Sequence, residues 1–348
     1  MKPLFLPPNP VQHFYRGGDR IAALRGITLA TDRQPEEWLG STVPRFGDSA
    51  VGLAVTADGT LLRDLVAADP ESWVGLSRGS EASDVGILVK LLDARQRLPV
   101  HVHPDRAVAS DHLNCPYGKT EAWFVLDAEP GSAFYVGWKD DVDPGELDSR
   151  RESQDSDWML AHLNRIEARK GMGILVPSGT PHAIDGGIFV AEVQEPTDYS
   201  ILLEWSITTS TREESHLDLG FERAMSAVST SALSDAELTN LVTSAGTSAA
   251  EPRVRSVLPE AADPYFRLHQ AAGGGGSTTE VEGGFAVILV TDGNGTLAFE
   301  GDAVQLNRGD ALVVPHAVGP WRVEGTASVL IARPGRGWPA TLGSDGVR

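Results

Sequence analysis

The sequence has little cysteine and a deficit of basic charge. One cysteine, Cys115, occurs among 348 residues, which excludes an internal disulfide, so the fold must be stable without cross-links. Lysine and arginine number 29 against 48 aspartates and glutamates, for a formal net charge of −19. This balance excludes the broad basic face of a nucleic-acid-binding protein. It remains compatible with one small phosphorylated molecule held by a local lysine or arginine.

Long apolar runs are also missing. No stretch approaches the ~20 apolar residues that a membrane-spanning helix needs. The first eight residues combine a short apolar run with several prolines, a pattern not typical of a signal peptide. Hydrophobic residues make up 41% of the chain and charged residues 22%, as in folded globular proteins. We therefore expect a cytoplasmic protein with neither membrane nor nucleic-acid partners.

What the sequence does contain is short apolar runs between turn residues. Its 37 glycines and 22 prolines are typical of strands joined by turns. The spacing favours a sandwich or barrel over alternating strands and helices. Strands are predicted over 86–93, 121–126, 133–138, 174–177, 188–193 and 199–205, and over 285–290, 295–299, 311–314 and 327–332.

Three segments show helical patterns instead. Residues 61–68 precede an Asp-Pro pair that ends a helix. Residues 155–170 place apolar residues at mixed two- and three-residue steps. Residues 212–244 are predicted as two helices broken near 229–234, and the glycine-rich run 273–277 is predicted as a loop.

The first chemical signal is a pair of histidines in the run Leu-Pro-Val-His-Val-His-Pro-Asp over 98–105. His101 and His103 stand two residues apart, so on a strand their side chains point to the same face. Neutral imidazoles are good ligands for zinc, iron or manganese. The pair alone is a weak signal, because two partly exposed strand histidines are common.

Two further segments strengthen this signal. Glu121 opens an apolar strand in Gly-Lys-Thr-Glu-Ala-Trp-Phe-Val, an unfavourable place for a carboxylate unless a positive charge faces it. His182 ends the run Gly-Met-Gly-Ile-Leu-Val-Pro-Ser-Gly-Thr-Pro-His, in which a strand enters a tight turn. The alternative is that these are unrelated core and surface residues.

Together these segments resemble the two metal motifs of the cupin superfamily. The second motif, G-x5-P-x-G-x2-H, is kept without a gap from Gly171 to His182. In the first motif Glu121 follows His103 by 18 residues rather than a handful, so residues 104–117 must leave the barrel and return. The resemblance implies a site with positions open to water or substrate.

The longer first motif resembles the type I (cupin) mannose-6-phosphate isomerase family, in its compact bacterial branch. It reads Gly-Ile-Leu-Val-Lys-Leu-Leu-Asp-Ala, then His-Val-His-Pro-Asp, then Gly-Lys-Thr-Glu-Ala-Trp. The chain also resembles the family outside this motif, over residues 3–6, 36–42, 61–65, 176–184, 193–198 and 309–315.

This resemblance implies a mainly β fold with a helical insert, built from two cupin (jelly-roll) β-barrels packed together. Residues 1–206 are expected to form an N-terminal layer and the catalytic metal-binding barrel, with helical excursions near 104–117 and 139–170. The helical insert would cover 207–262. A second, structural barrel over 263–335 and a loosely attached tail over 336–348 would follow.

The resemblance also assigns roles. It implies one divalent metal ion per chain, zinc first and manganese or iron as alternatives, bound by His101, His103, Glu121 and His182. His101 stands where the family usually has glutamine, and histidine also coordinates metals. Lys119 matches an active-site lysine that binds substrate, the alternative being a solvated loop lysine. Glu192 matches a carboxylate proposed as the acid/base group, the alternative being an exposed edge residue.

One position departs from the family. Where an arginine is normally found near the active site, this chain has Leu202. An arginine fork is a favoured way to hold a phosphate. Its loss leaves open a substituted anchor, an unphosphorylated sugar or lost activity. Arg212, His216 and Arg223 follow in the sequence, either as replacements or as surface charges.

The implied function is a metal-dependent aldose–ketose isomerase that interconverts mannose-6-phosphate and fructose-6-phosphate through a cis-enediol(ate). The first alternative is an isomerase of a free sugar or of another sugar phosphate. The second is a non-catalytic sugar-binding cupin. We expect a monomer or a homodimer whose partner is a small sugar or sugar phosphate.

Overall fold

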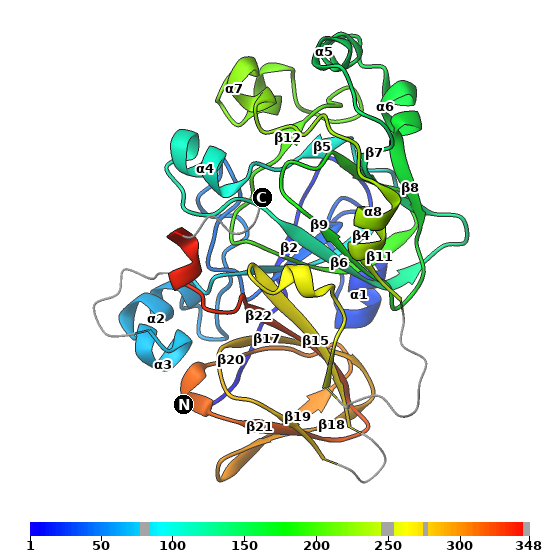
Figure 1. Cartoon of the computed structure of the whole chain (residues 1–348). Coiled ribbons are helices and arrows are strands. Elements are labelled where there is room, and N and C mark those ends of the chain that lie inside the picture. Colours follow the sequence, from blue (N-terminus) through cyan, green and yellow to red (C-terminus); the bar gives the residue numbers. More distant parts are fainter. Residues whose placement is uncertain (77–83, 245–253, 274–277, 344–348) are drawn as a thin grey trace.

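The computed structural model describes residues 1–76, 84–244, 254–273 and 278–343, and its strands form two pairs of antiparallel sheets (Figure 1). The first pair, which we call the first sandwich, joins a seven-stranded sheet (β13-β9-β6-β11-β4-β3-β2) to a five-stranded sheet (β12-β5-β10-β7-β8). The larger sheet contains β2 (Pro10–Val11), β3 (Glu36–Leu39), β4 (Leu88–Ala94), β6 (Glu121–Ala128), β9 (Gly173–Val176), β11 (Ile188–Gln194) and β13 (Val242–Thr243). The smaller contains β5 (His101–Val102), β7 (Ala133–Trp138), β8 (Leu163–Glu167), β10 (His182–Ile184) and β12 (Ile201–Leu202).

The second sandwich pairs a six-stranded sheet (β1-β20-β17-β22-β15-β14) with a four-stranded sheet (β16-β21-β18-β19). The larger sheet contains β1 (Leu4–Phe5), β14 (Val254–Ser256), β15 (Phe266–Ala272), β17 (Ala286–Asp292), β20 (Ala311–Val314) and β22 (Ser328–Pro334). The smaller contains β16 (Thr279–Val281), β18 (Asn294–Phe299), β19 (Asp302–Asn307) and β21 (Trp321–Gly325). One apolar cluster, with Ile288 and Ile331 from the larger sheet and Leu297 and Val323 from the smaller, fills the space between them.

The central strands of the first sandwich are buried on both faces, which explains their nearly continuous apolar sequences. On β6, Trp123 and Val125 enter the core between the two sheets of this sandwich. The alternate residues Ala122 and Phe124 enter a different cluster, because successive side chains of a strand point to opposite faces. This second cluster includes Leu289 and other residues of the second sandwich, so the two sandwiches pack through their larger sheets.

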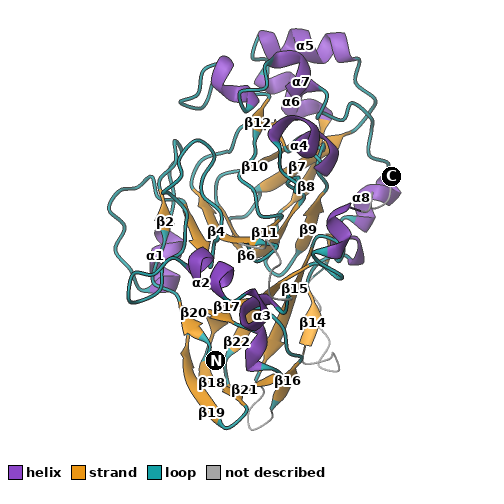
Figure 2. Ribbon diagram, turned by 90° about the vertical axis from the view of Figure 1, so that its left-hand side faces the viewer, coloured by secondary structure: helices purple, strands orange, loops and turns teal. Residues whose placement is uncertain are grey.

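Short helices cover the edges and ends of the sandwiches. The apolar faces of α2 and α3 pack onto the cluster between the sandwiches, whereas α5, α6 and α7 lie at the end of the first sandwich far from the second (Figure 2). None of the helices within the described ranges is both long and apolar enough to cross a bilayer. The helices are α1 (Asp19–Arg25), α2 (Leu62–Ala68), α3 (Pro70–Val74), α4 (Arg106–Leu113), α5 (Pro144–Glu152), α6 (Ser156–His162), α7 (Phe221–Met225) and α8 (Asp235–Asn240), with 3-10 turns η1 (Glu213–His216), η2 (Glu260–Ala262), η3 (His316–Val318) and η4 (Ala340–Gly343).

The structure confirms the mainly β prediction but corrects individual elements. The helix predicted over 155–170 ends at His162, and β8 follows because residues 163–167 pair with β7. The strand predicted over 199–205 is reduced to two residues, Ile201 and Leu202. The predicted pair of helices over 212–244 is present as α7 and α8, with the expected break between them and an additional 3-10 turn before α7.

The end of the chain is more firmly held than the sequence suggested. The indole nitrogen of Trp338 donates a hydrogen bond to the Tyr117 hydroxyl at 2.9 Å. The carbonyl of Thr341 accepts one from Arg106 at 3.1 Å. Residues 335–343 are therefore attached to the first sandwich rather than loose. Positions 274–277 of the predicted glycine-rich loop and 344–348 of the predicted tail lie outside the described residues.

Candidate metal centre and active site

Four predicted metal ligands converge inside the first sandwich. His101 and His182 are direct neighbours across the antiparallel strands β5 and β10. His103 follows β5, and Glu121 is the first residue of β6. One ligand atom from each of the four side chains lies within 4.8 Å of the others. All four side chains are buried, so the arrangement is a compact donor set that could hold a metal ion.

Backbone carbonyls fix the orientation of the three imidazoles. The Nδ1 atoms of His101 and His182 each lie within hydrogen-bond distance of the carbonyl two residues earlier, at 2.9 and 2.8 Å. The Nδ1 of His103 contacts the carbonyl of Tyr199 at 2.7 Å. Each Nδ1 thus carries the proton, and each Nε2 presents its lone pair to the centre, which is the usual way that outer contacts orient metal-binding histidines.

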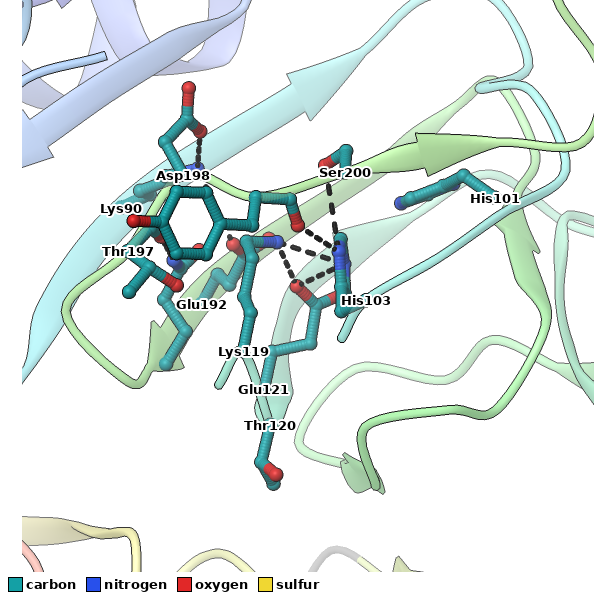
Figure 3. A network of polar contacts seen from close by, with 12 residues as sticks. Lys90, His101, His103, Lys119, Thr120, Glu121, Glu192, Thr197, Asp198 and Ser200 are labelled. Carbon is teal, nitrogen blue, oxygen red and sulfur yellow. Dashed lines mark hydrogen bonds and ion pairs between the residues drawn. The ribbon is translucent and has the colours of Figure 1, made fainter. Parts of the chain in front are cut away.

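A lysine supplies the positive charge that Glu121 needs. Lys119 Nζ donates to Glu121 Oε2 at 2.5 Å and to His103 Nε2 at 2.8 Å (Figure 3). Burial alone would raise the pKa of Glu121, but Lys119 and His103 hold it well below the usual range. The carboxylate is therefore ionised. Two of the four candidate ligands, Glu121 and His103, already contact the Lys119 ammonium group.

His101 and His103 stay neutral in this environment. Burial, followed by the neighbouring histidines, keeps the pKa of His101 well below its usual value. Burial and Lys119 lower the pKa of His103 to about 3. The buried Nε2 of His182 has no hydrogen-bond partner among the described residues. Imidazole nitrogens that offer ligand atoms to one centre, together with an ionised carboxylate, fit a divalent transition metal.

Glu192 lies on β11, beside the ligand-bearing strand. It is paired with Trp123 of β6 on one side and with Lys90 of β4 on the other. Its Oε1 lies 3.8 Å from Lys90 Nζ. Burial, with the Glu121 carboxylate second, raises the pKa of Glu192 to about 7. A buried carboxyl poised near neutral pH is suited to proton transfer.

The sequence reasoning missed Lys90, which organises the acidic side of the site. Its Nζ lies 3.4 Å from Asp198 Oδ1 and 3.6 Å from Glu36 Oε2 and stands 4.6 Å from the Trp38 ring centroid. Burial alone would lower the pKa of Lys90, but the three surrounding carboxylates outweigh burial and raise it. A signal was available, because this lysine interrupts an apolar run and such a charge needs partners.

Glu36 is a second missed residue. It is held from three sides: the Tyr15 hydroxyl donates to it at 2.6 Å, Trp38 Nε1 donates at 2.8 Å, and His13 Nε2 lies 3.2 Å away. Although burial alone would raise the pKa of Glu36, His13 and Lys90 keep it well below the usual range. Glu36 therefore provides a fixed negative charge that holds Lys90 in place.

These groups line a pocket of about 220 Å³ that opens from the site. Lys119, Glu121, Glu192 and His101 line it, and so does Leu202. The pocket joins two of the candidate metal ligands, His101 and Glu121, to both predicted catalytic groups, so a small polar molecule bound there can contact these four side chains.

The three candidate replacements for the missing arginine do not line this pocket. Arg212 pairs with Glu152 at 2.9 Å, and Arg223 is exposed. His216 is buried against Arg151. The second sandwich provides no comparable site within the described ranges: its His316 lies in η3 and packs near Gly75.

Comparisons with known proteins place this geometry in context. The family model "Mannose-6-phosphate isomerase, cupin domain" matches residues 261–334. The chain is 28% identical to the probable mannose-6-phosphate isomerase GmuF of Bacillus subtilis, over 95% of this chain and 99% of that protein. It is 28% identical to the mannose-6-phosphate isomerase of Streptococcus mutans, over 94% of this chain and 97% of that one.

A solved structure shares the fold. The mannose 6-phosphate isomerase of Bacillus subtilis matches with a TM-score of 0.76 at 22% identity, covering 96% of this chain and 100% of that chain. The matches extend over both sandwiches and therefore include the strands that carry the four candidate ligands.

Proposed function

Because the chain belongs to the mannose-6-phosphate isomerase family, as its motifs predicted, we propose that it is a metal-dependent aldose–ketose isomerase. Its proposed reaction interconverts mannose-6-phosphate and fructose-6-phosphate. The observation that carries this proposal is a buried three-histidine, one-carboxylate donor set, two of whose members, His101 and Glu121, line one pocket with Lys119 and Glu192.

The proposed cofactor is one divalent metal ion held by His101, His103, Glu121 and His182. Zinc is the first candidate, because it accepts imidazole and carboxylate ligands in four-coordinate sites, and manganese or iron are alternatives. When bound, such an ion supplies a Lewis acid for sugar oxygens.

Glu192 is the proposed acid/base group. In the aldose-to-ketose direction its carboxylate takes the proton from C2, while the C1–C2 double bond forms and a second proton passes from O2 to O1. Return of the first proton to C1 leaves the carbonyl at C2. A carboxyl group with a pKa of about 7 can both accept and return this proton near neutral pH, and such transfer contributes ~10²–10⁴-fold to rate.

Lys119 and Lys90 have different proposed roles. Lys119 lines the pocket and can donate a hydrogen bond to a substrate oxygen while it stays beside Glu121. Lys90 is enclosed by Glu36, Glu192 and Asp198, so its proposed role is to position Glu192 and to balance charge.

The test is an isomerase assay of the purified chain with mannose-6-phosphate, free mannose and other hexose phosphates. Activity is to be measured after chelation and after separate addition of zinc, manganese and iron(II). The proposal expects turnover of mannose-6-phosphate that chelation abolishes and one of these metals restores. Activity insensitive to chelation would overturn the metal mechanism.

A free sugar is the second candidate substrate, and Leu202 motivates it. This apolar side chain lines the pocket at the position where the family resemblance leads us to expect an arginine. A preference for mannose over mannose-6-phosphate in the same assay would favour this candidate. Binding of both sugars without turnover would instead favour the non-catalytic sugar-binding cupin.

The organisation of the chain is also a proposal. Residues 1–206 would form the catalytic barrel with its N-terminal layer, 207–262 the insert, 263–335 the structural barrel and 336–348 a terminal segment. The apolar cluster inside the second sandwich draws its residues from 254 to 331. It therefore supports a separate second barrel, and because β14 pairs with β15, that barrel begins by residue 254 rather than at 263. A cytoplasmic location and a monomeric or homodimeric state remain predictions.

A further inference from the structure

We infer that Arg45 binds the phosphate group of the substrate and takes the place of the arginine that is absent at Leu202. This inference rests on the proposed function, because it assumes a phosphorylated sugar in the pocket. Four considerations support it: the charge partners of the basic groups, the anchoring of the Arg45 loop, its place in the same pocket as Leu202, and the shape of the substrate.

Apart from the candidate ligand His101, the pocket is lined by four basic side chains, and these differ in whether a carboxylate lies beside them. Lys90 lies within ion-pair distance of three carboxylates, Lys119 is bonded to Glu121, and His13 contacts Glu36. Arg45 also lines the pocket but forms no ion pair within the described part of the chain. Its charge is therefore available to a ligand.

The donors of Arg45 are available as well. A guanidinium carries five N–H donors. One terminal nitrogen of Arg45 donates to the carbonyl of Gln12 at 2.9 Å, and this bond steadies the side chain without neutralising it. The remaining N–H groups can form the paired hydrogen bonds that arginine makes with phosphate oxygens.

The loop that carries Arg45 is fixed against the site. The backbone N–H of Phe46 donates to Asp198 Oδ2 at 3.2 Å, and the Phe46 and Tyr199 rings meet edge-on with centroids 5.8 Å apart. Asp198 and Tyr199 lead directly into β12, where Leu202 is paired with the ligand His101. Arg45 thus enters, from another loop, the same pocket that Leu202 lines, where the expected arginine is missing.

The shape of an open-chain hexose 6-phosphate fits this arrangement. Its reacting carbons, C1 and C2, lie at one end and its phosphate at the other. With the reacting end at the buried ligands and Glu192, the phosphate points toward the more exposed lining of the pocket, which includes half-buried Arg45 and its neighbour Phe46, a residue that is 39% exposed. Carboxylates of Glu36, Asp198 and Glu214 also line the pocket, so a dianion entering it needs a compensating cation.

The test compares Arg45→Ala and Arg45→Lys with a matched control, Arg165→Ala. Arg165 also donates to a backbone carbonyl, that of Gly131, but it lies outside the pocket. For Arg45→Ala we expect KM for mannose-6-phosphate to rise about 10- to 100-fold, the loss expected for a hydrogen bond to a charged group. The kcat should change much less, KM for free mannose should change by less than about threefold, and Arg45→Lys should recover part of the loss.

Direct binding separates this inference from the proposed function. The affinities of mannose-6-phosphate, mannose and inorganic phosphate for the metal-loaded wild type and variants are measured by calorimetry. If the wild type binds mannose-6-phosphate without isomerising it, the isomerase proposal fails. Even then, weaker binding of mannose-6-phosphate by Arg45→Ala than by the wild type would support the role of Arg45. Equal affinity of wild type and Arg45→Ala for mannose-6-phosphate, or an equal loss for mannose, would overturn the inference.

Discussion

His182 and His101 face each other across the antiparallel strands β10 and β5, with their ring centroids 4.1 Å apart. Two imidazolium rings at this distance would repel each other strongly in a buried site. The protein avoids this conflict because burial and the neighbouring rings keep the pKa of His101 well below its usual value. The His101 ring is thereby held neutral, and both rings offer a ligand atom to one centre.

Removal of one member of this pair should weaken metal binding. We expect His182→Ala to lower zinc affinity at least about tenfold, because the Nε2 of His182 has no hydrogen-bond partner in the described structure and is 3.4 Å from the fellow ligand Glu121. His101→Gln should retain metal, since an amide oxygen can also coordinate. Zinc titration and metal analysis after gel filtration measure both effects. The control is His162→Ala, because His162 is not among the convergent ligands and its Nδ1 contacts the Trp158 carbonyl. This control should bind zinc like the wild type. If His182→Ala also bound zinc like the wild type, the ligand assignment would be wrong.

The acid/base role of Glu192 predicts a loss of rate without a loss of metal. Glu192→Gln keeps the size of the side chain but removes the group that takes up the proton, so kcat should fall ~10²–10⁴-fold. Metal content should stay at the wild-type level, because Glu192 is not among the four convergent ligands. The measurement is kcat with mannose-6-phosphate beside metal analysis of the same preparation. A decrease in kcat of less than tenfold would remove Glu192 from the chemistry.

The attachment of the chain end predicts a stability effect at Gly86. Its φ is +73°, and a Cβ there would lie 2.5 Å from the Trp338 indole. Gly59 has a similar φ of +86° but open space around it. We expect Gly86→Ala to reduce the free energy of unfolding by about 1–3 kcal/mol more than Gly59→Ala does, as measured by urea denaturation. When Trp338 is also replaced by alanine, Gly86→Ala and Gly59→Ala should differ less in their free energies of unfolding. If the two variants still differed by the same amount, the clash with the indole would not be the cause.

The local motifs were readable from the sequence because their chemistry depends on short spacings. His101 and His103 share a strand face, and Glu121 is conspicuous at the start of an apolar strand. The bounds of β7 and β20 were also predicted, since turn residues flank both. These features depend on neighbours within one segment, which a single sequence displays directly.

The rest depends on strand register between distant segments. Pairing of β3 with β4 brings Trp38 opposite Lys90, and pairing of β4 with β11 brings Lys90 opposite Glu192. No periodicity within either segment shows which partner a buried charge will meet. The helix predicted over 155–170 was wrong from residue 163 onward for a related reason: pairing with β7 overrides the weak helical pattern of that segment.

The contact between His216 and Arg151 predicts that stability depends on pH below neutrality. Arg151 is fully buried, with its guanidinium 3.9 Å from the Phe221 ring centroid, and it donates to His216 Nε2. Burial, followed by this guanidinium, lowers the pKa of His216 to about 4 from the ordinary value of 6.5. Between these values the unfolded chain binds a proton that the folded chain does not, so stability falls as the pH falls from about 6.5 to about 4.

The corresponding experiment replaces His216 by a group that does not titrate. His216→Gln can still accept the hydrogen bond from Arg151 through its amide oxygen, but it gains no proton in this range. Between pH 7 and pH 5 the Tm of the wild type should therefore decrease more than the Tm of His216→Gln. Because other groups titrate equally in both proteins, the difference between the two curves isolates His216, and parallel curves would show that His216 has no part in the acid sensitivity of the fold.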